Sequence, residues 1–178
     1  MSSEDAGRVA AAIAEYDGKG IDSLASVAAQ IDPSPAVLQA LCDFVGSQDA
    51  RAHSASTWLL RRYASAGATL SSGQTEQVLN VLTADCHWEA RLHVLQMMGD
   101  LTLPANRVER LWPAVIEQTT DVNKFIRAWS YYGLAVIADQ HPIYRDRALT
   151  LLAAADQEAA ASVRARLRRI RKAFKWAG

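Results

Sequence analysis

Apolar residues recur at three- and four-residue spacing along almost the whole chain. Three of these stripes are Val37/Leu38/Leu41/Val45, Val78/Leu79/Leu82 and Val163/Leu167/Ile170/Phe174. This spacing gathers apolar side chains on one face of an α-helix, whereas a half-buried strand needs sustained alternation with a period of two, which we do not find. The pattern predicts an all-α protein.

Prolines and glycines divide the periodic stretches, as at Pro33, Pro35, Pro104 and Pro142, where a helix ends or a new one opens. The sequence predicts ten helices, over residues 4–16, 22–31, 35–46, 50–65, 74–84, 86–100, 105–118, 122–139, 143–155 and 159–175. Because the connections are short, successive helices should pack antiparallel as hairpins.

An acidic residue followed six positions later by an arginine occurs three times. The pairs are Asp85/Arg91, Asp121/Arg127 and Glu158/Arg164, with the acids 36 and 37 residues apart. Asp49 lies another 36 residues upstream, but Ala55 takes the place of the arginine. This period indicates stacked helical hairpins. We expect each acid to cap its helix, and each arginine to reach the equivalent acid or cap of the adjacent hairpin.

These residues resemble the HEAT-repeat family. The best match runs from Leu111-Trp112-Pro113-Ala114-Val115-Ile116 through Asp121 to Ile126-Arg127, and Thr83-Ala84-Asp85 with Ala90-Arg91 is a second. The resemblance covers residues 35–175, with residues 1–31 as N-terminal capping helices. It implies one domain over 1–178, a short right-handed α-solenoid of about five antiparallel hairpins that binds a partner on its concave face. Tetratricopeptide-like or other helical hairpins are the alternatives, although the sequence shows no tetratricopeptide consensus.

The acids also set a register for the second helix of each hairpin. Residues four, eight and eleven positions after each acid share one face, and they are His53, Thr57, Leu60; Glu89, His93, Gln96; Phe125, Trp129, Tyr132; and Ser162, Arg166, Arg169. We predict that Phe125, Trp129, Tyr132, Arg166, Arg169, His93 and Gln96 bind the partner. The alternative is that the helix over 122–139 is buried on every side, which would make its aromatic row part of the core.

Charge is balanced overall but not along the chain. Lys and Arg total 19, as do Asp and Glu, yet residues 1–50 carry a net charge of −6 and residues 142–178 carry +6. The basic end suits an acidic protein partner or a nucleic acid, or it is a solvated cap of the solenoid. The two oppositely charged ends would also permit self-association.

Catalytic and metal-binding patterns are weak. Cys86-His87-Trp88-Glu89 with His93 contains the right residue types, but adjacent helical residues point about 100° apart, so Cys86 and His87 do not form a nucleophile–base pair. Two cysteines and four histidines show no zinc-ligand spacing, and no glycine-rich phosphate loop occurs. We therefore expect no catalytic residue, metal or cofactor. A third interpretation is a small-molecule enzyme that uses the segment Cys86–His93.

The longest apolar run, Tyr131–Ala138, is far shorter than a membrane span of about 18 residues. The first residues, Met1-Ser2-Ser3-Glu4-Asp5, are acidic and lack the basic region of a secretory signal peptide. We therefore expect a cytoplasmic protein that does not enter a membrane. The predicted function is a non-catalytic binding module or scaffold that docks a protein partner. The alternative is a nucleic-acid-binding or DNA-repair protein of the HEAT-like class that uses the aromatic and basic C-terminal half.

Overall fold

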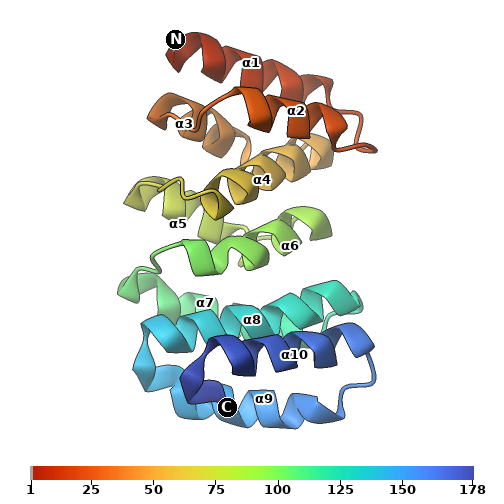
Figure 1. The fold of residues 1–178 in the computed structure, drawn as a ribbon, viewed down its shortest axis with the longest axis vertical. Coiled ribbons are helices and arrows are strands. Elements are labelled where there is room, and N and C mark those ends of the chain that lie inside the picture. The colour runs from red at the N-terminus through yellow and green to blue at the C-terminus, as the bar shows by residue number, and fades with distance from the viewer. Residues whose placement is uncertain (1) are drawn as a thin grey trace. The chain divides into compact units, whose positions relative to one another are not determined.

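The computed structural model describes residues 2–178, which form helices joined by short turns (Figure 1). The α-helices are α1 (Ser2–Glu15), α2 (Asp22–Gln30), α3 (Pro35–Phe44), α4 (Ala50–Ser65), α5 (Ser72–Asn80), α6 (Trp88–Met97), α7 (Ala105–Glu117), α8 (Lys124–Gln140), α9 (Arg145–Ala154) and α10 (Ala161–Ala173). The short 3-10 helices are η1 (Met98–Asp100), η2 (Gln118–Thr120), η3 (Pro142–Tyr144), η4 (Ala155–Gln157) and η5 (Lys175–Ala177). This region contains no strand, so the predicted all-α class and the ten helices are confirmed.

Local capping explains where several helices begin. Ser34 Oγ accepts a hydrogen bond from the backbone N–H of Val37, and Pro35 occupies the first position of α3, where its missing N–H costs nothing. Ser71 and Gln74 form a reciprocal capping box at the start of α5. Because of this cap, α5 starts at Ser72 and not at residue 74 as periodicity predicts, and it ends at Asn80, before the predicted residue 84.

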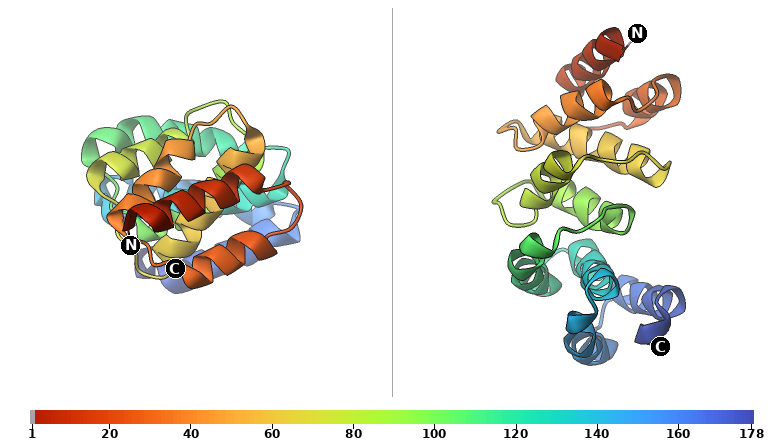
Figure 2. Two further views of the ribbon diagram at one scale, coloured as in Figure 1. Left: turned by 90° about the horizontal axis from the view of Figure 1, so that it is seen from above. Right: turned by 90° about the vertical axis from the view of Figure 1, so that its left-hand side faces the viewer.

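The contacts divide the chain into two compact units, one ending at Leu101 and the other covering Thr102–Gly178. In the first unit, α4 lies between α2 and α6, and α3 lies between α1 and α5, so the hairpins form two layers (Figures 1 and 2). Leu41, Leu59 and Leu95 are fully buried between these layers. The single domain over 1–178 stays a prediction.

In the second unit, α8 packs against α7, α9 and α10 (Figure 1). Ile126, Leu134 and Ile137 of α8 are completely buried, and the predicted stripe of Val163, Leu167 and Ile170 on α10 is buried as well. The core therefore uses one face of α10 and most of α8, which leaves only a narrow part of α8 for a surface.

Candidate partner-binding surface

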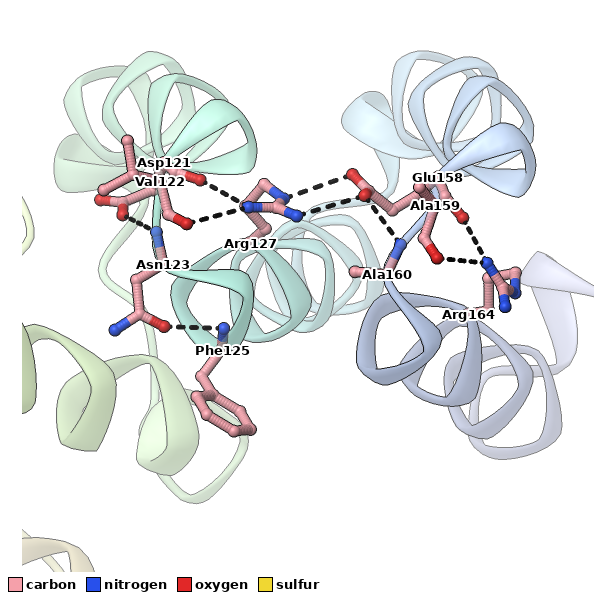
Figure 3. Close-up of polar contacts among 9 residues, drawn as sticks. All are labelled: Asp121, Val122, Asn123, Phe125, Arg127, Glu158, Ala159, Ala160 and Arg164. Carbon is pink, nitrogen blue, oxygen red and sulfur yellow. Dashed lines mark hydrogen bonds and ion pairs between the residues drawn. The ribbon is translucent and has the colours of Figure 1, made fainter.

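Arg127 connects two successive hairpins of the second unit (Figure 3). Its Nη1 donates to the carbonyl oxygens of Asp121 and Val122 at 2.8 and 3.3 Å. On its other side, Nε and Nη2 donate to the two carboxylate oxygens of Glu158 at 3.3 and 3.2 Å. The predicted link from an arginine to the acid of the next hairpin is therefore confirmed for this pair, as a two-pronged, charge-assisted contact.

The acids act on the turns that precede the helices, not as helix caps. Asp121 Oδ1 accepts the backbone N–H of Asn123 at 2.7 Å, and Glu158 Oε1 accepts that of Ala160 at 3.1 Å (Figure 3). The cap of α8 is Asn123, whose side chain accepts the N–H of Phe125. The expected capping role of Asp121 and Glu158 is wrong because each helix begins three residues after its acid.

Hydrogen bonds from backbone and side chain keep Glu158 ionised. Its pKa lies below the usual range, first because it accepts the N–H of Ala160 and then because Arg127 donates to it. Arg164 Nη1 in turn donates to the carbonyls of Glu158 and Ala159 at 2.8 and 2.7 Å. Arg164 therefore donates to the two backbone carbonyls of the turn at Glu158, just as Arg127 donates to the two backbone carbonyls of the turn at Asp121.

The first copy of the pattern is shifted by two residues. Asp49 is itself the cap of α4, and the residue that corresponds to Asp121 is Ser47, whose Oγ accepts the N–H of Asp49 at 3.2 Å. The prediction that the residues four, eight and eleven positions after Asp49 line a surface is therefore wrong. His53, Thr57 and Leu60 are all buried, because α4 packs against α2, α3 and α6. A serine in place of the acid was the sequence signal for this shift.

An arginine stacked on aromatic rings forms the main surface feature of the second unit. The Arg166 guanidinium carbon lies 3.4 Å from the centroid of the Trp129 ring and 6.0 Å from that of Tyr132. Trp129 and Tyr132 meet edge to face, with centroids 5.2 Å apart. The aromatic row on α8 and the cationic row on α10 therefore meet at these three residues.

The stack continues toward the C-terminus through residues that the sequence argument did not select. Tyr132 lies 6.1 Å from Phe174, and Phe174 lies 6.1 Å from Trp176. Arg145 covers Trp176 at 5.8 Å, and Trp176 Nε1 donates to Asp139 at 3.1 Å. We call the set Trp129, Tyr132, Arg166, Phe174 and Trp176 the aromatic–arginine surface. Phe174 was counted with the core stripe, and Trp176 lies beyond the last periodic position.

The other two predicted residues of this unit stand outside the stack. Phe125 is 48% exposed, with the Lys124 ammonium 5.4 Å from its ring centroid. Arg169 is exposed on α10, and its positive charge adds to the effect of burial in lowering the pKa of Arg166. Arg169 therefore places a second positive charge close to the Trp129 stack.

His93 and Gln96 lie on α6 of the first unit, and both are half-buried. His93 Nδ1 is 3.1 Å from Thr57 Oγ1 of α4, so His93 joins two packed helices. Burial, helped by the positive charge of Arg61, lowers the pKa of His93 to about 4. At neutral pH this imidazole is uncharged.

The Cys86–Glu89 segment holds no activated nucleophile. Cys86 Sγ donates to the carbonyl of Val81 at 3.5 Å, and burial raises the pKa of this thiol. Glu89 accepts a hydrogen bond from Ser54 at 2.9 Å and lies 3.7 Å from His87 Nδ1. The hydrogen bond between Ser54 and Glu89 holds α6 against α4. The third interpretation, an enzyme built on this segment, receives no geometric support.

Metal-ligating residue types are dispersed in the described part of the chain. Residues 2–178 contain no group of three or more His, Cys, Asp or Glu side chains that could hold a metal ion. None of the helices described combines the length and the apolar character that crossing a membrane requires.

No known family model matches this sequence, and comparisons with curated proteins and with solved structures find no significant relative. The HEAT resemblance thus rests on the residues quoted above and stays a prediction.

Proposed function

We propose that the protein is a non-catalytic binding module, a short right-handed α-solenoid of HEAT-like hairpins, and that its aromatic–arginine surface docks an acidic partner protein. The layered hairpins of the first unit and the Arg127–Glu158 link in the second support the repeat architecture. In repeat proteins of this kind, stacked hairpins present extended surfaces to partners.

One observation carries the proposal: the Arg166 guanidinium stacks on an aromatic ring and pairs with no carboxylate of the described residues. It lies flat against Trp129 and is half-buried, yet no carboxylate of residues 2–178 pairs with it. Stacking occupies the faces of a guanidinium and leaves its N–H edges available for a carboxylate. On the same helix, Arg164 already donates to the backbone carbonyls of Glu158 and Ala159, and Arg171 already pairs with the Asp156 carboxylate. Arg166 is therefore oriented but unpaired.

The composition of the surface fits a binding site. Interface energy concentrates in Trp, Tyr and Arg residues that hold a rigid position, and Trp129, Tyr132 and Arg166 hold one another. The second unit carries 13 Lys and Arg against 7 Asp and Glu, a net charge of +6. Such a field speeds the encounter with an acidic partner and rejects basic ones.

A nucleic acid is the second candidate, because bases stack on aromatic rings beside arginines that contact phosphates. Its signature differs from that of a protein partner. Affinity for DNA should fall steeply between 50 and 200 mM salt, since each phosphate contact releases counterions. Fluorescence anisotropy of a labelled single-stranded oligonucleotide over this salt range separates the two candidates.

The test compares four forms of the protein in affinity capture from cell extract: the parent chain, Trp129→Ala, Arg166→Ala and Arg110→Ala. Arg110 is an exposed arginine on α7 and serves as the control for loss of one charge. We expect an acidic protein that the parent and Arg110→Ala retain and the other two forms lose. With that protein purified, Trp129→Ala should weaken binding by about 2 kcal/mol, or roughly 30-fold.

Two outcomes contradict the proposal. One is a captured protein that both surface variants bind as tightly as the parent does. The other is salt-sensitive DNA binding that Trp129→Ala abolishes, with no protein retained by any of the four forms.

A further inference from the structure

Two arginines lie one turn apart on α10, at the aromatic–arginine surface. Arg166 and Arg169 are three positions apart in this helix, a spacing that places side chains on one face with Cβ atoms about 5–6 Å apart. Arg166 is half-buried and Arg169 is exposed. None of the ion pairs formed among residues 2–178 includes either of them. The surface therefore holds two neighbouring positive charges that no described carboxylate pairs with.

The two guanidinium groups repel each other, and one of them is held in place. The charge of Arg169 adds to the effect of burial in lowering the pKa of Arg166. The Arg166 guanidinium carbon lies 3.4 Å from the centroid of the Trp129 ring, so the stack fixes its plane and leaves its N–H edges available. An anion bound beside both guanidinium groups would relieve the repulsion.

A pair of arginines complements a doubly charged anion better than a single carboxylate does. A carboxylate carries one negative charge, whereas a phosphate monoester carries about −1.5 to −2 at pH 7 and offers three acceptor oxygens. Arg166 and Arg169 can each donate two N–H groups to such an anion, because a guanidinium presents its donors as a planar fork. The charge of the site thus selects a phosphate monoester.

The positive part of the surface is short. The aromatic stack continues to Phe174 and Trp176, and there Asp139 accepts the Trp176 Nε1–H at 3.1 Å. A nucleic acid carries one negative charge on every phosphate of an extended backbone, and it would bring these charges toward the Asp139 carboxylate. A single phosphate monoester needs only Arg166 and Arg169. A phosphorylated side chain therefore fits better than a nucleic acid.

We infer that the aromatic–arginine surface recognises a phosphorylated side chain of the partner protein, with the phosphate bound by Arg166 and Arg169. This inference rests on the proposed function and names the group by which the partner is recognised. Clusters of arginines are a recurring means of binding phosphorylated segments. Phosphorylation of the partner would then control docking.

The probe for this inference is phenyl phosphate, and its matched control is phenyl sulfate, which has the same shape and a single negative charge. Titration at pH 8 is followed by the backbone amide resonances of α10 and the indole resonance of Trp129. We expect saturable shifts and about tenfold tighter binding of phenyl phosphate, because its second negative charge is attracted by the second guanidinium.

The pH dependence of the probe provides an independent readout. The second pKa of a phosphate monoester is about 6, so phenyl phosphate is a monoanion at pH 5. Its advantage over phenyl sulfate should then disappear. Phenyl sulfate keeps its single charge at both pH values, and it therefore controls for titration of the protein itself, including that of His141, the one histidine of the second unit.

Three variants locate the charges. Arg169→Gln should weaken phenyl phosphate binding about tenfold and phenyl sulfate binding by a smaller factor. Arg168→Gln removes the same charge from an exposed position on another face of α10, and it should leave both affinities unchanged. Arg166→Lys keeps the charge but loses the planar fork, so it should weaken phenyl phosphate binding as well.

The inference is overturned if phenyl sulfate binds as tightly as phenyl phosphate at pH 8, or if Arg169→Gln and Arg168→Gln behave alike. It is equally overturned if no saturable shifts occur on α10, or if a single-stranded oligonucleotide displaces phenyl phosphate from Arg166 with the steep salt dependence of phosphate-backbone contacts.

Phosphatase treatment of the protein captured from cell extract separates this inference from the proposed function. We expect the treated protein to lose its affinity for the parent chain. If it binds as before and still requires Trp129 and Arg166, the phosphate inference fails and the docking surface stands. If Trp129→Ala and Arg166→Ala bind the untreated protein as tightly as the parent does, the proposed function itself fails.

Discussion

Both units consist of packed α-helices, but different side chains join the packed helices of each unit. In the first unit, the second helices of neighbouring hairpins meet through Ser54–Glu89 and Thr57–His93. In the second unit the corresponding connection is the Arg127–Glu158 ion pair. The first unit has a net charge of −6 and the second +6.

This difference shows how one architecture yields two kinds of surface. In the second unit, Arg127 donates to both carboxylate oxygens of Glu158, and Arg168 and Arg169 of α10 are exposed. In the first unit, Asp85 forms no ion pair with another described residue, and it lines a cavity of about 320 Å³. The comparison leads to four predictions, given from the largest expected effect to the smallest.

Substitutions at a core position and at a surface position of α8 should differ most in the unfolding free energy that they remove. Leu134 is 0% exposed, so Leu134→Ala should cost roughly 2–5 kcal/mol of unfolding free energy. Trp129 is half-buried, mainly under Arg166, and Trp129→Ala should cost less. Denaturant unfolding of both variants, with acrylamide quenching to report exposure, makes the comparison. Equal losses with Trp129 shielded from the quencher would mean that the aromatic row belongs to the core.

The Arg127–Glu158 ion pair of the second unit should contribute more to the free energy of unfolding than the Arg51–Asp49 ion pair of the first unit. Arg127 and Glu158 have side chains only 19% and 20% exposed, whereas Arg51 and Asp49 are 62% and 53% exposed. Arg127→Ala should therefore destabilise by about 1.5–3 kcal/mol, and Arg51→Ala by less than about 0.5 kcal/mol. Urea midpoints measure both. Indistinguishable midpoints would show that the hairpin link contributes nothing.

The first unit should be sensitive to mild acid through His93. Its pKa is about 4 in the folded protein and about 6.5 when unfolded, so the unfolded chain takes up the proton first as the pH falls. Stability contributed by the neutral form is present above pH 6.5 and decreases toward pH 4, by up to about 2 kcal/mol at pH 5. His53, whose pKa is also lowered, acts in the same direction. His93→Gln should make the stability of the first unit less dependent on pH. An NMR titration midpoint of His93 near 6.5 would contradict the prediction.

The smallest effects are expected on α10. Arg169 is exposed, so Arg169→Glu should change stability by less than about 0.5 kcal/mol. Arg166→Glu removes the stack on Trp129 and should cost about 1 kcal/mol. Circular dichroism should show intact helices in both variants. Unfolding of Arg169→Glu would mean that the assignment of the outer face of α10 is wrong.

The sequence alone determined the features that depend on neighbours along the chain. The 3.6-residue period placed all ten helices, because burying one apolar face of a helix requires that spacing. The repeat of acid and arginine predicted the contact between Arg127 and Glu158, since both residues recur at equivalent positions of successive hairpins.

The tertiary structure decided what depends on distant neighbours. It showed that Ser47, and not Asp49, is the residue equivalent to Asp121, because a hydroxyl accepts the same backbone N–H as a carboxylate and a search for acidic residues alone passes over it. It buried the face of α4 that contains His53, because helices on several sides pack against it. It also placed Trp176 beside Phe174 and placed Asp85 at a cavity. Periodicity predicts which residues share one helix face, but it does not predict which residues of other elements pack against that face.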